Sequence, residues 1–438
     1  MKSSPVAVSL LLFLFGVVAA TTGCDSTHAD PGHVRTASAA APPPATVDWP
    51  GFRGPHRNGI SSEKDWLTQW PEEGPKKLWT AQVGLGYSSV AVADGKAYTL
   101  GNRDGQETVY CFDAVEGRTH WRYSYPCDLV ANLHVGGPGA TPTIDGERVY
   151  TLSKQGHLLC FMTNPKSTAG ADTINEPLWS VALQASLGVP QPEWGFTSSP
   201  LIYKDLLVLD VGGLAAFDKM TGKLAWRSAK YRAGYGSPVR YDAPTGETLI
   251  ASITNDALVV VEPATGREVA KYPWESQYVT ASTTPVISGR TFFLSTGYGG
   301  GCALVELVGE KFNELYRNEE MSNHMCTSVL RDGKLYGIHG NSHTARQCKL
   351  VCLDLVTGKR VWEQRGFGCG ALMMADDKLL IQSDEGYLTV AEATPEGYKE
   401  LAKTRVFEGP TWTMPVLCRG RVYCRSEAGD VICLDVRK

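Results

Sequence analysis

Short apolar runs recur along the chain, each separated from the next by a tight polar turn, and three or four such runs make up a repeated unit. Two units end in the same phrase, Asp-x-x-Thr-Gly-Lys-x-x-Trp, at residues 218–226 and 354–362. Apolar runs bounded by turn residues predict strands, and a period of about 44 residues with several strands in each unit is typical of β-propeller blades. The predicted fold is therefore all-β.

The turn between the first two strands of each unit allows the blades to be counted. A two-residue hairpin turn needs positive φ, so it selects Asp-Gly or a similar pair. Eight turns are predicted, at Asp94-Gly95, Asp145-Gly146, Lys204-Asp205, Pro244-Thr245-Gly246, Ser288-Gly289, Asp332-Gly333, Asp376-Asp377 and Arg419-Gly420. Longer early intervals imply insertions near residues 165–176 and 184–193. We predict an eight-bladed β-propeller.

The strand predicted at residues 77–83 has no partner in the first unit, while the eighth unit has no fourth strand after residues 430–435. We expect the early strand to complete the eighth blade and close the ring, which removes an unpaired sheet edge.

The tryptophan of this early strand stands at the same repeat position as the tryptophans of other outermost strands. These rings are expected to fill the wedge between neighbouring blades, at Trp79, Trp121, Trp179, Trp226 and Trp362.

The first 24 residues predict export of the protein and are not expected to be part of the folded domain. Residues 1–24 combine Lys2, an apolar stretch and a small-residue end, as a secretory signal does. The end resembles a bacterial lipobox, with Cys24 as the lipidated residue, although Thr21 stands where leucine is usual and ordinary cleavage remains the alternative. Residues 25–47 predict a polar tether, and residues 48–438 the propeller. We expect an exported protein anchored to a membrane, facing the periplasm or the cell exterior.

The composition of the chain bears on nucleic-acid binding, on disulfides and on metal binding. Charged residues make up 20% of the chain and the net charge is −4, so no basic surface for nucleic acid is expected. Four of the twelve cysteines share one small, inward-facing repeat position and are expected to be buried: Cys111, Cys160, Cys352 and Cys433. A disulfide elsewhere stays open. His324, Cys326, His343 and Cys369 could form a metal site, but they lack the short ligand spacing of zinc sites, so no metal is predicted.

The loops that lead into the innermost strands carry an aromatic residue or histidine in every blade. Because these loops share one face of a propeller, they would form a rim around the central channel. The candidate rim for a ligand or a partner consists of Tyr87, His134, Trp194, Tyr235, Tyr278, His324, Phe367 and Trp412. The alternative is that these rings pack against the Ser-Ser-Pro and Thr-Pro sequences at the strand starts.

The repeated phrase resembles the tryptophan-docking repeat of the pyrroloquinoline-quinone-like eight-bladed propellers. Residues 48–59, Asp-Trp-Pro-Gly-Phe-Arg-Gly-Pro-His-Arg-Asn-Gly, also resemble the segment that opens such domains. The resemblance covers residues 48–438. The family includes the lipoprotein outer-membrane assembly factor B, which is not catalytic, and, more distantly related to this chain, quinoprotein alcohol dehydrogenases.

The resemblance implies two different functions. The dehydrogenases hold the quinone between a tryptophan and a disulfide of adjacent cysteines, with Ca²⁺ bound by Glu, Asn and Asp and a further Asp as base. This chain has no adjacent cysteines, so no catalytic or cofactor-binding residue is predicted. A non-catalytic scaffold for envelope proteins is expected. The alternatives are a dehydrogenase of an alcohol, sugar or polymer that uses the quinone with calcium, and a propeller that binds a glycan or another small ligand.

Overall fold

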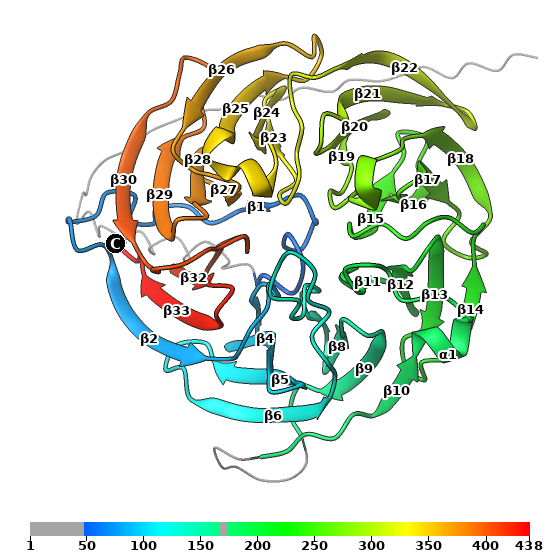
Figure 1. Ribbon diagram of the computed structural model, residues 1–438, viewed down its shortest axis with the longest axis horizontal. Coiled ribbons are helices and arrows are strands. Elements are labelled where there is room, and N and C mark those ends of the chain that lie inside the picture. Colours follow the sequence, from blue (N-terminus) through cyan, green and yellow to red (C-terminus); the bar gives the residue numbers. More distant parts are fainter. Residues whose placement is uncertain (1–47, 166–172) are drawn as a thin grey trace, which may run out of the picture. The chain divides into compact units, whose positions relative to one another are not determined.

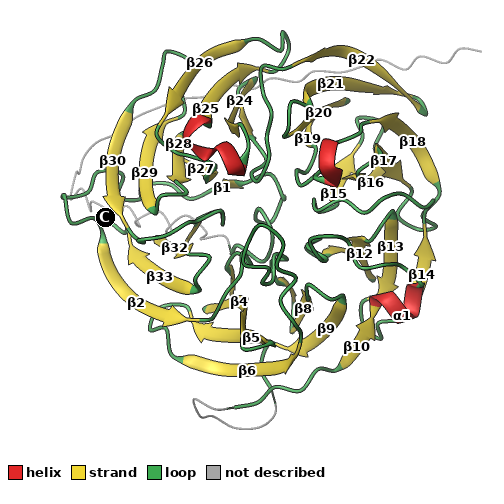
Figure 2. Cartoon of the chain, viewed as in Figure 1, coloured by secondary structure: helices red, strands yellow, loops and turns green. Residues whose placement is uncertain are grey.

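The computed structural model describes residues 48–165 and 173–438. The predicted signal, Cys24 and the tether lie outside these ranges. The described residues form eight sheets arranged as a ring (Figure 1). Among the described residues, helix is confined to three short segments (Figure 2), α1 Leu183–Leu187, η1 Gln277–Val279 and η2 Ser342–Gln347. None of the described helices has the length and apolar character that a membrane span requires.

Each blade runs outward from the centre of the ring in chain order, except that the eighth blade takes its outermost strand from residues 76–82, and adjacent strands within a blade are antiparallel. The first four blades are β3 Ala91–Ala93, β4 Lys96–Arg103, β5 Gln106–Asp113 and β6 Thr119–Pro126; β7 Thr143–Asp145, β8 Arg148–Leu152, β9 His157–Met162 and β10 Trp179–Ala182; β11 Leu201–Tyr203, β12 Leu206–Asp210, β13 Leu214–Asp218 and β14 Leu224–Arg227; and β15 Val239–Asp242, β16 Thr248–Ile253, β17 Ala257–Val261 and β18 Glu268–Pro273.

The remaining blades follow the same plan. They are β19 Val286–Ser288, β20 Thr291–Thr296, β21 Gly301–Val308 and β22 Lys311–Asn318; β23 Val329–Arg331, β24 Lys334–His339, β25 Lys349–Asp354 and β26 Arg360–Arg365; β27 Ala371–Ala375, β28 Lys378–Gln382, β29 Tyr387–Glu392 and β30 Glu400–Arg405; and β31 Val416–Cys418, β32 Arg421–Arg425, β33 Asp430–Asp435 and β2 Lys76–Gln82. The prediction of an eight-bladed propeller is confirmed.

The closing strand lies where the sequence places it. β2 pairs antiparallel with β33, with Trp79 opposite Cys433 and Thr80 opposite Ile432. The hairpin turns also agree with the prediction, except that two lie one residue later, at residues 146–147 and 289–290. In both turns the glycine takes the first position, with φ of 55° and 57°, so the residue before it can remain in the strand.

The tryptophans of the outermost strands dock on the next blade. Trp79 donates its indole N–H to the Ala114 carbonyl at 3.2 Å, and Trp226 donates to the Pro263 carbonyl at 2.9 Å. The same bond recurs from Trp121 to Thr163, Trp179 to Lys219 and Trp362 to Thr394. The fifth blade uses the Tyr316 hydroxyl, bonded to Leu355, for the same purpose. The indoles therefore join successive blades, as the sequence predicts.

Hydrophobic cores lie between consecutive blades. One cluster, for example, joins Leu258 of the fourth blade to Phe292 of the fifth. The four cysteines at the shared repeat position are buried in these cores, as expected. A blade that buries its two faces only against its neighbours gains little stability alone, so the ring folds as one body.

The segment 48–61, called the plug below, lies against the innermost strands of several blades. Trp49 pairs with Val92 of the first blade, the Ile144 N–H donates to the Pro50 carbonyl, and β1 (Ile60–Ser61) pairs in parallel with β27. Figure 1 shows this blue segment crossing the ring. The plug therefore ties together blades that are far apart in the sequence.

Candidate functional site

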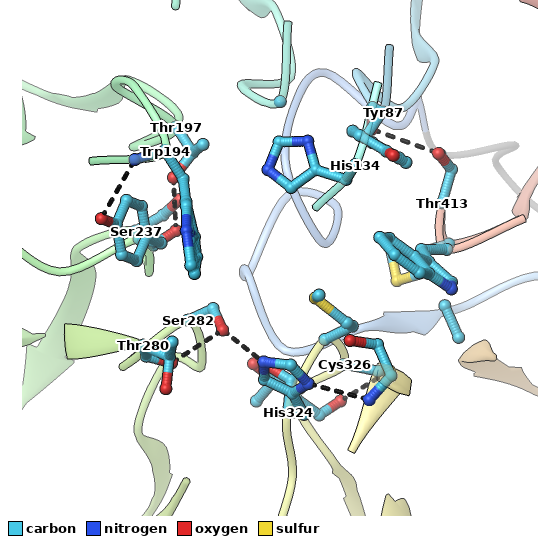
Figure 3. Close-up of a pocket in the computed structure, with 18 of the residues that line it drawn as sticks. Tyr87, His134, Trp194, Thr197, Ser237, Thr280, Ser282, His324, Cys326 and Thr413 are labelled. Carbon is cyan, nitrogen blue, oxygen red and sulfur yellow. Dashed lines mark hydrogen bonds between the residues drawn. The ribbon is translucent and has the colours of Figure 1, made fainter. Parts of the chain in front are cut away.

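A cavity of about 770 Å³ lies at the centre of the ring. Its wall comes from the loops that lead into the innermost strands and from loops that join second to third strands, and Phe52 and Arg53 of the plug form part of its floor. Figure 3 shows His134, Trp194 and His324 reaching the cavity from different sides. Sites for small ligands have volumes of roughly 300–1,000 Å³, so the cavity is large enough for a ligand or for side chains of a partner.

Seven of the eight predicted rim residues line this cavity, and they are called the rim below: Tyr87, His134, Trp194, Tyr235, Tyr278, His324 and Trp412. Their role in binding stays a prediction. Phe367 is an exception, because it is buried in the core between the sixth and seventh blades. Its ring contacts Tyr398 at 5.7 Å between centroids. The recurrence of an aromatic residue before the innermost strand therefore does not show whether that residue is buried in the core or lines the cavity.

Five of the rim side chains form a continuous row. Trp412 stacks on Tyr87 at 5.4 Å, and the edge of His134 meets Tyr87 at 5.7 Å and Trp194 at 6.1 Å. Trp194 then stacks on Tyr235 at 6.2 Å. Such contacts fix the ring orientations and leave an amphipathic aromatic surface beside the cavity.

A second aromatic group lies across the cavity. Tyr298 contacts Tyr278 at 5.0 Å, His324 at 4.8 Å and His343 at 5.1 Å between ring centroids. The Tyr298 N–H donates to Asn341 at 2.6 Å, which joins the loops of the fifth and sixth blades. The positions of these rings therefore depend on contacts between the fifth and sixth blades.

The strand starts are linked to each other by hydroxyl groups. The backbone N–H of Thr141 donates to the Ser199 hydroxyl, that of Ser199 to Ser237, that of Ser237 to Thr284 and that of Thr284 to Thr327. Their donor to acceptor distances are 2.9–3.3 Å. The Ser-Ser-Pro and Thr-Pro sequences thus have a structural role of their own, holding five successive blades in register.

Two rim histidines are neutral at pH 7. Burial lowers the pKa of His134 to about 4, and the nearby Lys154 ammonium adds to this effect. Burial, followed by the influence of His343, lowers the pKa of His324 to about 4. The Nδ1 atoms accept backbone N–H groups from Gly136 at 2.9 Å and Ser342 at 3.1 Å, so the proton resides on Nε2.

The structure adds two buried cations that the sequence reasoning missed. Lys154 and Arg53 both line the cavity and both are almost fully buried. Lys154 lies in the loop between β8 and β9, which joins the second strand of its blade to the third. Arg53 lies in the plug, where its role depends on contacts with Thr327 and Ser328, about 270 residues away in the chain.

The mouth of the cavity exposes apolar side chains on strained backbone. Leu133 is 93% exposed and Tyr278 is 69% exposed. Leu133, Tyr278 and Val279 have φ of 62°, 55° and 55°, values that cost energy for residues other than glycine. Exposed apolar groups on strained loops beside a cavity are typical of a binding surface.

The cavity does not fit the quinone and calcium site implied by the resemblance to the dehydrogenases. Glu193 is the one carboxylate among the described residues that line the cavity, and it accepts a hydrogen bond from Asn132 at 2.9 Å. Asp384 lies outside the lining and accepts the Cys369 N–H. No three His, Cys, Asp or Glu side chains in residues 48–165 and 173–438 are grouped as metal ligands would be. The quartet of His324, Cys326, His343 and Cys369 is thus not assembled.

Comparisons with known proteins agree with the fold. The family model described as outer membrane protein assembly factor BamB matches residues 67–164 and 165–364. Comparison with curated protein sequences finds no match.

Solved structures give the same fold at low identity. BamB from Moraxella catarrhalis is 15% identical, with a TM-score of 0.57, covering 82% of this chain and 98% of its own. Quinohemoprotein alcohol dehydrogenase from Comamonas testosteroni is 11% identical, with a TM-score of 0.62, covering 89% of this chain and 81% of its own. A europium-containing methanol dehydrogenase is 11% identical, with a TM-score of 0.62, covering 87% and 90%. By the family model, the chain belongs to the outer membrane protein assembly factor BamB family.

Proposed function

We propose that the protein is an exported, lipid-anchored and non-catalytic propeller that binds protein partners of the cell envelope through the rim. The observation that carries this proposal is the combination of aromatic rim, exposed Leu133 and Tyr278, and a deep cavity on one face. Aromatic side chains are enriched at the energetic centres of protein interfaces because they bury large area with few torsions to fix. Family membership supports a partner in the envelope.

The test is a cross-linked pull-down of tagged protein from membranes. A triple alanine variant of Trp194, Tyr278 and Trp412 removes three rings that line the cavity. A matched triple variant of Val308, Leu315 and Val361 removes exposed apolar groups from the outer strands β21, β22 and β26. Loss of the same partners from the rim variant alone supports the proposal. Equal recovery of partners with wild type, the rim variant and the outer-strand variant, at unchanged melting temperatures, would show that the rim does not bind them.

The anchor is a separate part of the proposal. If Cys24 is lipidated, Cys24→Ser should move the protein from the membrane fraction to the soluble fraction, and intact mass spectrometry should show loss of the acyl chains. Wild-type protein that carries no lipid would contradict the anchor, but it would not affect the proposal that the rim binds partners.

A second candidate function is binding of a glycan or another small ligand, which the volume of about 770 Å³ and the aromatic lining favour. It predicts that a ligand raises the thermal stability by mass action, by about 2.7 kcal/mol at a hundredfold excess over Kd. A glycan array without hits would count against it. The quinone dehydrogenase alternative is tested in parallel by adding pyrroloquinoline quinone and Ca²⁺ and following reduction of an acceptor dye.

A further inference from the structure

Lys154 is a buried cation without a carboxylate partner. The residue is 3% exposed, and its Nζ donates to the Trp194 carbonyl at 2.7 Å. No carboxylate of the described chain forms an ion pair with it within 4.0 Å. Glu107 is the carboxylate that acts electrostatically on Lys154; it is buried outside the cavity lining and accepts the Tyr125 hydroxyl at 2.6 Å. A buried ammonium lacks most of its hydration, so it gains from an anion that enters the cavity.

Gly195 makes room for this side chain, because a Cβ there would lie 2.7 Å from Lys154 Cδ. A Cβ on Gly139 would lie 2.9 Å from Thr197 Cγ2 and at an ordinary contact distance of 3.8 Å from Lys154 Nζ. Gly139 and Thr197 both line the cavity with Lys154. Because Gly139 has no side chain, none extends from this position between the ammonium and the cavity.

The rest of the cavity reinforces the positive charge. Arg53, in the floor, donates to the carbonyls of Thr327, Ser328 and Asn58, all at 2.8 Å, and not to a carboxylate. Glu193 is exposed at the mouth. Inside the protein, charges are screened less than in water, so two cations in the wall attract an anion more strongly than surface lysines do.

We propose that the cavity receives an acidic side chain of the partner, with its carboxylate bound to the Lys154 ammonium beside His134 and a neighbouring aromatic side chain of the partner packed on Trp194. This inference rests on the proposed function, because it names the chemistry of the partner segment that the rim binds. A peptide is favoured over a free acid because Leu133 and Tyr278 extend an apolar surface beyond the cavity, where flanking residues of a chain would lie.

The test uses the full chain and two capped heptapeptides that differ only at the centre, Gly-Ser-Phe-Asp-Phe-Ser-Gly and Gly-Ser-Phe-Asn-Phe-Ser-Gly, in titration calorimetry. The aspartate peptide should bind at least tenfold more tightly. Lys154→Met should abolish this preference, whereas Lys311→Met, an exposed lysine of β22, should preserve it. By NMR, the pKa of His134 should rise when the aspartate peptide binds, because a carboxylate favours the charged imidazole.

Several outcomes would overturn the inference. These are equal affinity of the two peptides for wild type, a preference that survives in Lys154→Met, or no binding of the aspartate peptide at millimolar concentration. Binding of tri-galacturonate that depends on Lys154, with neither peptide bound, would assign the site to an acidic glycan instead. If Lys154→Met does not fold, the two peptides and the His134 titration decide the question in wild type. Should partner capture still depend on the rim, only this inference fails and the proposed function stands.

Discussion

The Trp79 indole of the closing strand lies directly against Gly117, in the last turn of the first blade. A Cβ placed on Gly117 would lie 2.5 Å from Trp79 Cγ. The same relationship recurs between Trp179 and Gly222 and between Trp226 and Gly266. The glycine of this turn therefore has two roles, since it takes a positive φ and also leaves room for the ring of the preceding blade.

Trp79→Ala should destabilise the protein by about 3–5 kcal/mol, because it removes a large buried ring at the seam where the two ends of the ring of blades meet. Deleting residues 25–45, which the sequence predicts to be a tether, should leave stability almost unchanged. Thermal and urea denaturation of both variants measure the difference. If Trp79→Ala melts with wild type, the ring is not closed through this indole.

Gly117→Ala separates ring contact from backbone strain when compared with Gly246→Ala. Both glycines have positive φ, 72° and 89°, but a Cβ on Gly246 would meet no atom within 4 Å. Strain alone should cost about 1–2 kcal/mol at Gly246, and displacement of the Trp79 ring should add about 1–3 kcal/mol at Gly117. If urea denaturation shows equal losses of unfolding free energy for the two variants, the Trp79 indole moves aside without an energetic cost.

Arg53→Met tests the plug. The substitution leaves buried carbonyls of the sixth blade without donors, and the expected loss is about 2–4 kcal/mol. Arg240→Met, at an exposed pair with Asp242, should change stability by less than about 1 kcal/mol. Chemical denaturation measures both. Similar small effects for the two variants would show that the plug contributes little to the stability of the ring.

Glu107 should give stability a measurable pH dependence. Burial raises the pKa of Glu107 to about 7, although Tyr125 opposes the shift by hydrogen bonding. The folded protein thus holds this proton more tightly than the unfolded chain, so the stabilising contribution is present below pH 4.5 and is lost as the pH rises through 7.

The unfolding free energy of wild type minus that of Glu107→Gln should therefore fall by up to about 3 kcal/mol between about pH 4 and about pH 8. His134 and His324 act in the opposite direction, because their lowered pKa values of about 4 add stability that is lost as the pH falls from 6.5. Both proteins carry these histidines, so their effect cancels in the difference. A difference that stays flat with pH would contradict the burial of Glu107.

The blades could be predicted from sequence because their determinants are local. A hairpin turn and a Thr-Gly turn depend on a few adjacent residues, and each recurs often enough to fix the register of the repeat. The closing strand followed from the same pattern, since the eighth unit had no fourth strand and Trp79 had the character of an outermost strand.

The site could be predicted only in part because its determinants are long-range. The recurring aromatic position located Tyr87, Trp194 and the other rim residues, yet it also selected Phe367, whose ring packs on Tyr398 instead. Arg53 reaches carbonyls at residues 327 and 328, and no local pattern specifies such a contact. The buried charge of Lys154 likewise appears only when the loops of separate blades meet.

Site-specific photo-crosslinking in membranes shows whether the rim contacts a partner protein. A photoreactive phenylalanine analogue replaces Tyr278, 69% exposed at the rim, or Leu315, 51% exposed on the outer strand β22, in otherwise identical proteins. We expect an adduct with a discrete envelope protein from position 278 and none from position 315. Adducts from position 315 alone, or the same adducts from both positions, would contradict binding through the rim.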